Sequence, residues 1–219
     1  MTARAEILTR VRAAIGRTET SGPPPAPEYA NTAIIPARGR GTQAELVERF
    51  IDKATEAAAT TERVANTGEI GNAIARWLQT EGLPASLVLA PDPALEPGGW
   101  ETADGLTIRR GAARAGDAVS VTPVIAGIAE TGSIMVASGP ATPYTLNFLP
   151  DIHIAIVPAG RIVGAYEDAW AIVRRNDEVG MALPRTVTLI TGPSRSSDIE
   201  RTVTIGVHGP LRLHIVLVG

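Results

Sequence analysis

The chain contains no cysteine among its 219 residues, which excludes disulfide bonds and any zinc or iron–sulfur site held by cysteine thiolates. Its three histidines are scattered along the sequence and lack the spacing of a metal site. We therefore expect no metal and no cofactor bound by this chain. Any redox chemistry would need a partner that carries the electrons.

Aromatic residues and excess charge of one sign are also scarce. The chain has three Trp, three Tyr and two Phe, and its 20 basic residues nearly balance 23 acidic ones. Nucleic-acid binding needs a basic surface or aromatic rings on which bases stack, so we do not expect it. No apolar run reaches the roughly 18 residues of a membrane span, and the N-terminus lacks the apolar core of a signal peptide. The expected location is the cytoplasm.

The sequence lacks the glycine fingerprints of the common nucleotide-binding loops, but helical and strand patterns alternate along it. Apolar residues recur at helical spacing, and short apolar runs indicate buried strands. This alternation predicts an α/β fold: a Rossmann-like layered structure with a largely parallel central sheet flanked by helices. The predicted helices begin at Thr42 and cover residues 69–80 and about 165–175, and the predicted strands cover residues 87–90, 133–138, 153–157, 186–190 and 213–218.

The first 41 residues differ from the rest. Residues 1–17 carry Ile7, Leu8, Val11 and Ile15 at near-helical spacing, which predicts an amphipathic helix. Residues 18–41 are rich in proline and glycine and predict an extended linker. We expect three parts: the N-terminal helix (1–17), the linker (18–41) and the α/β domain (42–219). The helix could pack on its own domain or dock on a partner.

Residues 191–210, TGPSRSSDIERTVTIGVHGP, combine two glycine turns, an arginine and a helix-start signal. Ser197 and Glu200 have the spacing of a capping box, so the segment predicts a loop followed by a helix. N–H groups at a helix N-terminus attract anions, and the loop would then form a pocket for a carboxylate or phosphate. The simpler alternative is a capped helix start facing solvent. The pocket residues would be Ser194, Arg195, Ser196 and Ser197.

The same segment resembles a known family. TGPSRSSDIE, followed by GVHGP and the terminal run LHIVLV, is similar to the C-terminal signature of the lactate-utilisation protein C family, whose members carry a LUD domain. GIAETGSIMV at residues 127–136 and LPDIHIAIVPAGRIV at residues 149–163 resemble that family's other two blocks, in the same order. Together the blocks cover roughly the C-terminal half of the chain.

The resemblance implies a fold related to ribose-phosphate isomerase, glucosamine-phosphate deaminase and CoA transferases. It also implies a component of a lactate-oxidising system that works with iron–sulfur protein subunits, which would hold the clusters, rather than a catalyst acting alone. Ligands of such folds usually bind at the carboxyl ends of the strands. Two loops beside predicted strands are the candidate ligand-binding sites, with the residues Thr131, Gly132, Gly192, Pro193, Ser194, Arg195, Ser196, Ser197, His208 and Gly209.

Glu130 is the candidate catalytic residue. It lies in the small and apolar stretch AGIAETGS, where a desolvated carboxylate could act as a base, a nucleophile or an oriented acceptor. CoA transferases of a similar fold use a glutamate nucleophile. Alternatively, Glu130 accepts N–H groups of its own turn and holds the loop in place.

The three histidines divide by context. His153 alternates with three isoleucines, and His214 alternates similarly in the last strand, so we expect both to be covered by packing. His208 lies between glycines in GVHGP, where its ring could reach a ligand or stabilise a turn.

Two functions from different classes follow. The first is an accessory subunit of cytoplasmic L-lactate oxidation, with iron–sulfur partners and a pocket for a small carboxylate or phosphate. The alternative is a stand-alone enzyme of the CoA-transferase or sugar-phosphate type that uses Glu130.

Overall fold

The computed structural model describes residues 3–16, 35–178, 184–197 and 203–219. Its contacts divide the chain into two units, Met1–Ala33 and Ile34–Gly219. In the first unit, α1 (Ala3–Ala14) confirms the predicted N-terminal helix, and none of its residues is buried. Most of the predicted linker lies outside the described residues. Its last part, residues 35–41, contains the short helix η1 (Ala37–Gly39) and belongs to the second unit.

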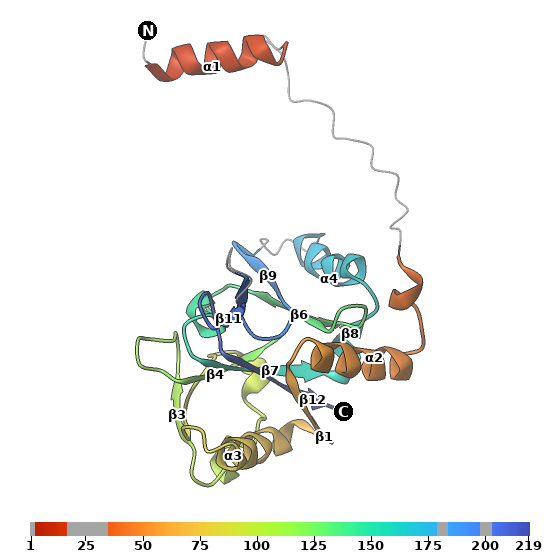
Figure 1. Cartoon of the computed structure of the whole chain (residues 1–219), viewed down its shortest axis with the longest axis vertical. Helices are drawn as coiled ribbons and strands as arrows, with labels where there is room; N and C mark the ends of the chain where they lie inside the picture. The colour runs from red at the N-terminus through yellow and green to blue at the C-terminus, as the bar shows by residue number, and fades with distance from the viewer. Residues whose placement is uncertain (1–2, 17–34, 179–183, 198–202) are drawn as a thin grey trace. The chain divides into compact units, whose positions relative to one another are not determined.

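The second unit is built on a six-stranded sheet in which every neighbouring pair is parallel. Figure 1 shows the sheet within this unit. This confirms the predicted α/β class. In parallel sheets both faces are covered, so the strands are apolar runs rather than alternating ones. The strand order is β1 (Thr60–Val64), β12 (Arg212–Val218), β7 (Ile152–Pro158), β4 (Val119–Pro123), β2 (Ser86–Leu89) and β3 (Thr107–Arg110).

A second sheet holds two of the strands that the sequence predicted. Residues 133–138 and 186–190 form strands, but these pair antiparallel with each other and lie outside the parallel sheet. The order of this four-stranded sheet is β8 (Ile162–Val163), β5 (Ala126–Ile128), β6 (Ser133–Ala137) and β9 (Val187–Ile190). A separate hairpin pairs β10 (Arg195–Ser197) with β11 (Val203–Ile205).

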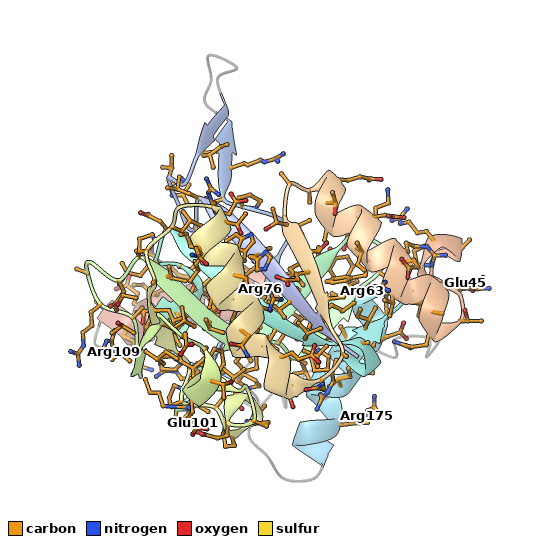
Figure 2. The ribbon with its side chains drawn as sticks, turned by 90° about the horizontal axis from the view of Figure 1, so that it is seen from below. Glu45, Arg63, Arg76, Glu101, Arg109 and Arg175 are labelled. Atoms are coloured by element: carbon orange, nitrogen blue, oxygen red, sulfur yellow. The ribbon has the colours of Figure 1, made fainter. Side chains whose placement is uncertain are left out.

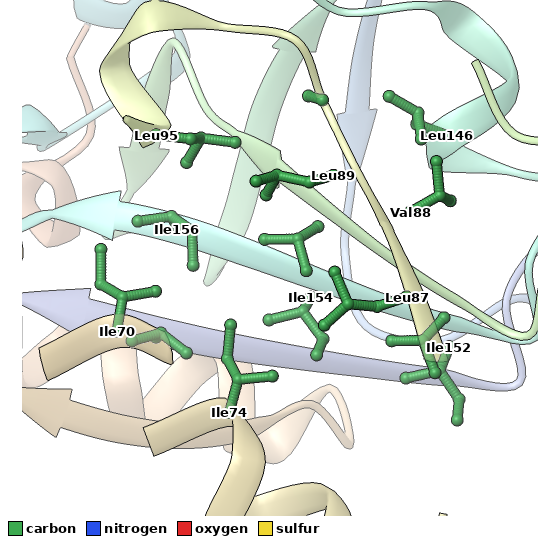
Figure 3. Packing of buried hydrophobic residues seen from close by; sticks show 14 of the residues in the cluster. Ile70, Ile74, Leu87, Val88, Leu89, Leu95, Leu146, Ile152, Ile154 and Ile156 are labelled. Carbon is green, nitrogen blue, oxygen red and sulfur yellow. The ribbon is translucent and has the colours of Figure 1, made fainter. Parts of the chain in front are cut away.

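Helix α3 (Ile70–Thr80) covers one face of the parallel sheet and confirms the helix predicted for residues 69–80. Figure 3 shows Ile70 and Ile74 directed toward the isoleucines of β7. Ile152, Ile154 and Ile156 all belong to this core, because alternate residues of a strand share one face. The odd-numbered residues of β7, including His153, therefore face the other side of the sheet.

That other side is covered by α2 (Gln43–Glu56) together with the second sheet. Thr42 and Glu45 form the predicted capping box at the start of α2. Its apolar side chains pack on the odd-numbered residues of β7 and β12 and on β6. Helix α4 (Tyr166–Glu178) covers the far face of the second sheet. The layers are thus α3, the parallel sheet, α2 with the second sheet, and α4.

Ion pairs lie on the outer surface of this unit. Arg63 of β1 contacts Glu48 at 2.6 Å, and Arg76 of α3 contacts Glu62 at 2.9 Å. Figure 2 shows both arginines with the helices that flank the sheet. Exposed pairs of this kind contribute at most about 1 kcal/mol each, so they mark a solvated surface. Short 3₁₀ helices complete the chain: η2 (Thr67–Glu69), η3 (Pro93–Leu95), η4 (Trp100–Thr102), η5 (Tyr144–Asn147) and η6 (Ala159–Arg161).

Within the described ranges, every helix falls short of the length and apolar character that a membrane-spanning helix needs.

Candidate functional site

A cavity of about 240 Å³ lies where the end of β9 meets the first residues of β7 and β12. It is on the side of the parallel sheet that faces the second sheet. Its walls come from the end of η5, from β9 with the loop that follows, and from the turn before β12. The lining residues are Asn147, Phe148, His153, Thr188, Leu189, Ile190, Thr191, Gly192, Pro193, Ser194, Arg195, His208, Gly209, Pro210 and Leu213.

Most of the predicted ligand-binding residues meet in this cavity. Gly192, Pro193, Ser194, Arg195, His208 and Gly209 all line it. Hydrogen bonds join the two segments that carry them: the Ser194 backbone N–H donates to the Pro210 carbonyl at 2.9 Å, and the His208 N–H donates to Ser194 Oγ at 3.3 Å. The loop after β9 and the turn before β12 therefore form one wall.

The helix predicted to start at Ser197 is wrong where the structure describes the segment. Residues Arg195–Ser197 form β10, which pairs with Val203–Ile205, while residues 198–202 lie outside the described residues. Alternating β-branched Val203 and Ile205 favour a strand, and Ser197 is also compatible with the end of a hairpin strand. The described residues therefore give no support to an anion site at a helix N-terminus, and the first residues of the predicted helix, 198–202, lie outside them. Ser196 does not line the cavity, and the side chain of Ser197 is not described.

Arg195 lies at the exposed rim of the cavity. One of its guanidinium nitrogens, Nη2, donates to the carbonyl oxygen of Ala57, just after α2, at 3.4 Å. This contact is long, and within the described ranges the remaining guanidinium donors are available for a ligand.

Two residues that line the cavity each carry a buried polar atom with no hydrogen-bond partner among the residues that the structure describes: Asn147 Oδ1 and His153 Nδ1. Asn147 is 2% exposed and His153 is fully buried. An unsatisfied buried polar atom costs about 1–3 kcal/mol, and native proteins contain few of them. Both residues line the same cavity, so a ligand there would lie beside these two side chains.

The other ring nitrogen of His153, Nε2, has a hydrogen-bond partner. Nε2 lies 2.7 Å from Thr122 Oγ1, a buried hydroxyl on the neighbouring strand β4. Burial lowers the pKa of His153 to about 4, so the ring is neutral at pH 7. His153 is therefore available as a neutral hydrogen-bonding group, not as a cation.

The sequence pattern did not identify these two residues as candidates. His153 is covered, as expected from its alternation with isoleucines, but it also lines the cavity. The available signal was a histidine on the inner face of an otherwise apolar strand. Asn147 follows the buried Leu146 in a short η5 turn, and an asparagine in a turn is too common to be a signal.

Glu130 lies near this cavity but does not line it. It is 6% exposed, and Arg38 Nε lies 3.5 Å from its Oε2, an oxygen without a hydrogen-bond partner in the described part of the chain. Its backbone N–H donates to the Gly164 carbonyl. In the alternative interpretation, the Glu130 carboxylate accepts N–H groups of its own turn. Oε2 accepts none from the described residues, so this interpretation is wrong for that oxygen.

A cluster of hydroxyl groups links the Glu130 loop to the cavity. Ser133 Oγ lies 2.7 Å from Thr131 Oγ1, 3.1 Å from Tyr166 Oη and 2.6 Å from Thr191 Oγ1. Thr191 is itself a cavity residue. The structure thus brings the two predicted loops together through the start of β6 and the end of β9, as their antiparallel register requires.

Two glycines fit both loops against the end of α2. Gly132 and Gly192 have φ of +67° and +69°, and a Cβ on either would overlap the backbone of Ala54 or Ala57. Only glycine adopts this conformation at no steric cost while allowing so close an approach. Gly132 is therefore a structural residue of the loop, outside the cavity lining.

A second, more apolar cavity of about 390 Å³ lies at the carboxyl ends of β4, β7 and β12, where open α/β sheets commonly bind ligands. Its polar lining residues are Thr67, Asp92, Thr142 and Arg161. None of the buried polar atoms that lack a partner in the described ranges belongs to it. The first cavity is therefore the better candidate. Of the described residues, no group of three or more His, Asp or Glu could hold a metal ion.

Comparison with known proteins agrees with this architecture. The chain is similar to a DUF162 family protein from Deinococcus radiodurans, with a TM-score of 0.60 and 24% identity over 82% of this chain and 100% of that one. At this identity the likeness shows the fold alone.

Curated relatives match part of the chain. Lactate utilization protein C of Geobacillus thermodenitrificans (strain NG80-2) is 37% identical over 91 residues, 42% of this chain and 38% of that protein. The protein of that name from Bacillus subtilis (strain 168) is 38% identical over the same shares. These matches span about two fifths of the relatives' length. The LUD domain family matches residues 101–218, more than half of the sequence, and the chain therefore belongs to the LUD domain family.

Proposed function

We propose that this chain is an accessory component of L-lactate utilisation, in which the cavity beside β9 binds a small carboxylate. Membership of the LUD domain family and relatives named lactate utilization protein C support the lactate assignment. Oxidation of lactate to pyruvate releases two electrons. A chain without cysteine offers no thiolate ligands for an iron–sulfur cluster, so partner proteins that carry such clusters would accept them.

The observation that carries the proposed binding site is that Asn147 and His153, which line one cavity with Arg195 at its rim, each hold a buried polar atom without a partner among the described residues. Buried polar groups without protein partners favour a ligand that pairs with them. The volume of about 240 Å³ is just below the usual range of about 300–1,000 Å³ for small-molecule sites. A ligand of a few carbon atoms fits this size, and Arg195 offers a charge-assisted hydrogen bond to its carboxylate.

Thermal unfolding tests the binding site. L-Lactate, pyruvate, phosphate, sugar phosphates, nucleotides and CoA esters would each be added to the full chain and to Arg195→Ala. A ligand at 100 times its Kd stabilises the protein by about 2.7 kcal/mol, which raises Tm by roughly 5 to 10 °C for a chain of this size. Loss of the arginine should weaken carboxylate binding by about 1.5–3 kcal/mol.

Arg63→Ala is the matched control, because Arg63 pairs with Glu48 on the surface, and neither residue lines the cavity. It should leave the ligand shift unchanged. A shift that is equal in wild type, Arg195→Ala and the control would contradict the proposed role of Arg195.

The accessory role has its own test. The purified chain alone should not oxidise lactate with an artificial electron acceptor, whereas a reconstituted mixture with cluster-bearing partners should require it. Lactate turnover by the chain alone would contradict the accessory role.

The alternative is a stand-alone enzyme of the CoA-transferase or sugar-phosphate type with Glu130 in the chemical step. Its supporting observation is a carboxylate only 6% exposed, with one oxygen that has no hydrogen bond within the described ranges. In this case Glu130→Gln should abolish acyl or isomerase turnover and leave ligand binding intact. Equal turnover of the variant and the wild type would eliminate the alternative.

A further inference from the structure

We propose that the second cavity, at the carboxyl ends of β4, β7 and β12, is a separate binding site for an apolar monocarboxylic acid, whose carboxylate pairs with Arg161. This cavity shares no lining residue with the cavity beside β9, so the proposal is independent of the proposed function. Its volume of about 390 Å³ lies within the usual range of about 300–1,000 Å³ for small-molecule sites.

The cavity lies where the chain leaves two neighbouring strands in opposite directions. After β2 the chain runs to the side of α3, where the Gly71 N–H donates to the Gly98 carbonyl at 2.8 Å. After β4, which pairs with β2, it enters β5 of the second sheet on the other side. Connections that diverge in this way leave a crevice outside the carboxyl ends of a parallel sheet. Both connections line the cavity, through Leu95 after β2 and Val124 after β4.

Apolar side chains from three core clusters form most of the wall. Figure 3 shows Ile70, Leu95 and Ile156 at one end of the core that packs on α3. The core that packs on α2 adds Val124, and the core beneath α4 adds Ile172. The three clusters meet here without filling the space. An apolar ligand would therefore continue the packing of the wall and be removed from water.

Arg161 is the basic residue of this lining. It is exposed, and its guanidinium has no hydrogen-bond or ion-pair partner among the residues that the structure describes. Its backbone is held in place by α2, because Gln43 Nε2 donates to the carbonyls of Ala159 at 2.7 Å and Ile162 at 3.0 Å. A guanidinium with available donors pairs with a carboxylate through two parallel N–H bonds.

The charges of the lining favour a ligand with a single negative charge. Asp92 is the other charged lining residue, and its Oδ1 accepts the Ala94 N–H at 2.9 Å. Thr142 Oγ1 donates to the Ala137 carbonyl at 2.7 Å, so this hydroxyl also takes part in the bonds of the wall. One arginine in a cavity with one aspartate disfavours a dianion such as a phosphate ester, because the aspartate repels the second charge.

A matched ligand series on the full chain tests this site. The probe is 3-phenylpropionate, which joins an apolar body to one carboxylate. Its amide lacks the charge, acetate lacks the apolar body, and 3-phenylpropyl phosphate carries a second charge. NMR titration should give 3-phenylpropionate a Kd at least about fivefold lower than each of the other three, because it alone combines the apolar body with one carboxylate.

Arg161→Met tests the proposed partner of the carboxylate. Methionine removes the charge and keeps an unbranched side chain, so the Kd of 3-phenylpropionate should rise at least about fivefold while that of the amide stays the same. The Tm of the unliganded protein should also stay the same, because the guanidinium has no partner within the described ranges. Arg195→Met is the matched control, since Arg195 lines the cavity beside β9. It should leave the Kd of 3-phenylpropionate unchanged.

Three outcomes would overturn the proposal. Equal Kd values for 3-phenylpropionate and its amide, or tighter binding of the phosphate, would contradict recognition of a single carboxylate. A loss of affinity in Arg195→Met but not in Arg161→Met would assign the probe to the cavity beside β9. Failure of 3-phenylpropionate to bind would overturn the second site and leave the proposed binding of a small carboxylate beside β9 unaffected.

Discussion

At the scale of single residues, the hydrogen bond between Thr122 and His153 connects stability with the proposed site. The hydroxyl pairs with Nε2 and thereby fixes the orientation of a ring that belongs to the cavity lining. Thr122 is 1% exposed and His153 is fully buried, so no solvent replaces the bond if it is lost. Thr122 thus acts through His153 as a positioning residue.

Thr122→Val should therefore destabilise the protein by about 1–3 kcal/mol, because valine has the same shape and leaves Nε2 buried without a partner. Urea unfolding measures this change. The matched control is Thr107→Val, at an exposed position of β3, which should alter the free energy of unfolding by less than about 0.5 kcal/mol. If Thr122→Val and Thr107→Val lower the free energy of unfolding equally, the hydrogen bond between Thr122 and His153 contributes nothing to stability.

At the scale of elements, the last turn of α2 supports both loops of the site. Gly132 approaches Ala54 and Gly192 approaches Ala57, each with positive φ. The hydroxyl cluster of Thr131, Ser133 and Thr191 then joins the loops directly. The helix end sets the separation of the loops, which explains why two distant segments need glycine at equivalent points.

Gly132→Ala and Gly192→Ala should each cost at least about 2 kcal/mol, since a methyl group must displace the backbone of α2 and also tolerate positive φ. Gly82→Ala is the control: its φ is +63°, but a Cβ there would meet nothing within 4 Å. It should cost only the conformational penalty of about 1 kcal/mol. Chemical unfolding of the three variants separates the two effects, and equal losses at all three would contradict the role of the contact with α2.

The elements also show how far local sequence patterns predict the fold. Apolar spacing located α3 and the capping box located α2, because those signals lie within one helix. Strand partners are not encoded locally. Residues 133–137 are apolar like a parallel strand, yet β6 pairs antiparallel with β9 in a separate sheet.

The site could be predicted only in part for the same reason. The glycine loop at residues 192–195 was recognisable from its turn residues, and it does line the cavity. The cavity wall also contains His153 of β7 and Asn147 of η5. They meet only because β7 pairs with β4 and packs near η5, a tertiary arrangement that no local spacing encodes. Ser197 and Glu200 match a capping box although Ser197 lies in β10, because the spacing of two residues does not encode the pairing of residues 195–197 with residues 203–205. Glu200 itself lies outside the described residues.

At the scale of the whole molecule, two buried histidines couple folding to pH. His153 lies against Thr122 on one face of the parallel sheet. On the other face, His214 stacks on Trp77 at 4.0 Å and lies 2.8 Å from Thr60 Oγ1. Burial lowers the pKa of each from 6.5 to about 4. The Glu62 carboxylate, 4.0 Å from His214, favours the charged ring, but the ring is 1% exposed and burial is the larger effect.

These shifts predict acid destabilisation. Below pH 6.5 the unfolded chain binds protons that the folded chain does not, so stability is complete above pH 6.5 and falls as the pH decreases toward 4. At pH 5 the loss relative to pH 7.5 should be about 2 kcal/mol for each histidine, or about 4 kcal/mol in total. Urea unfolding at both pH values measures it. His214→Phe retains an aromatic ring for the stack on Trp77 and should lower the loss by about half, while the contribution of carboxylates stays the same in both proteins. An equal loss in wild type and variant would show that His214 is not the titrating group.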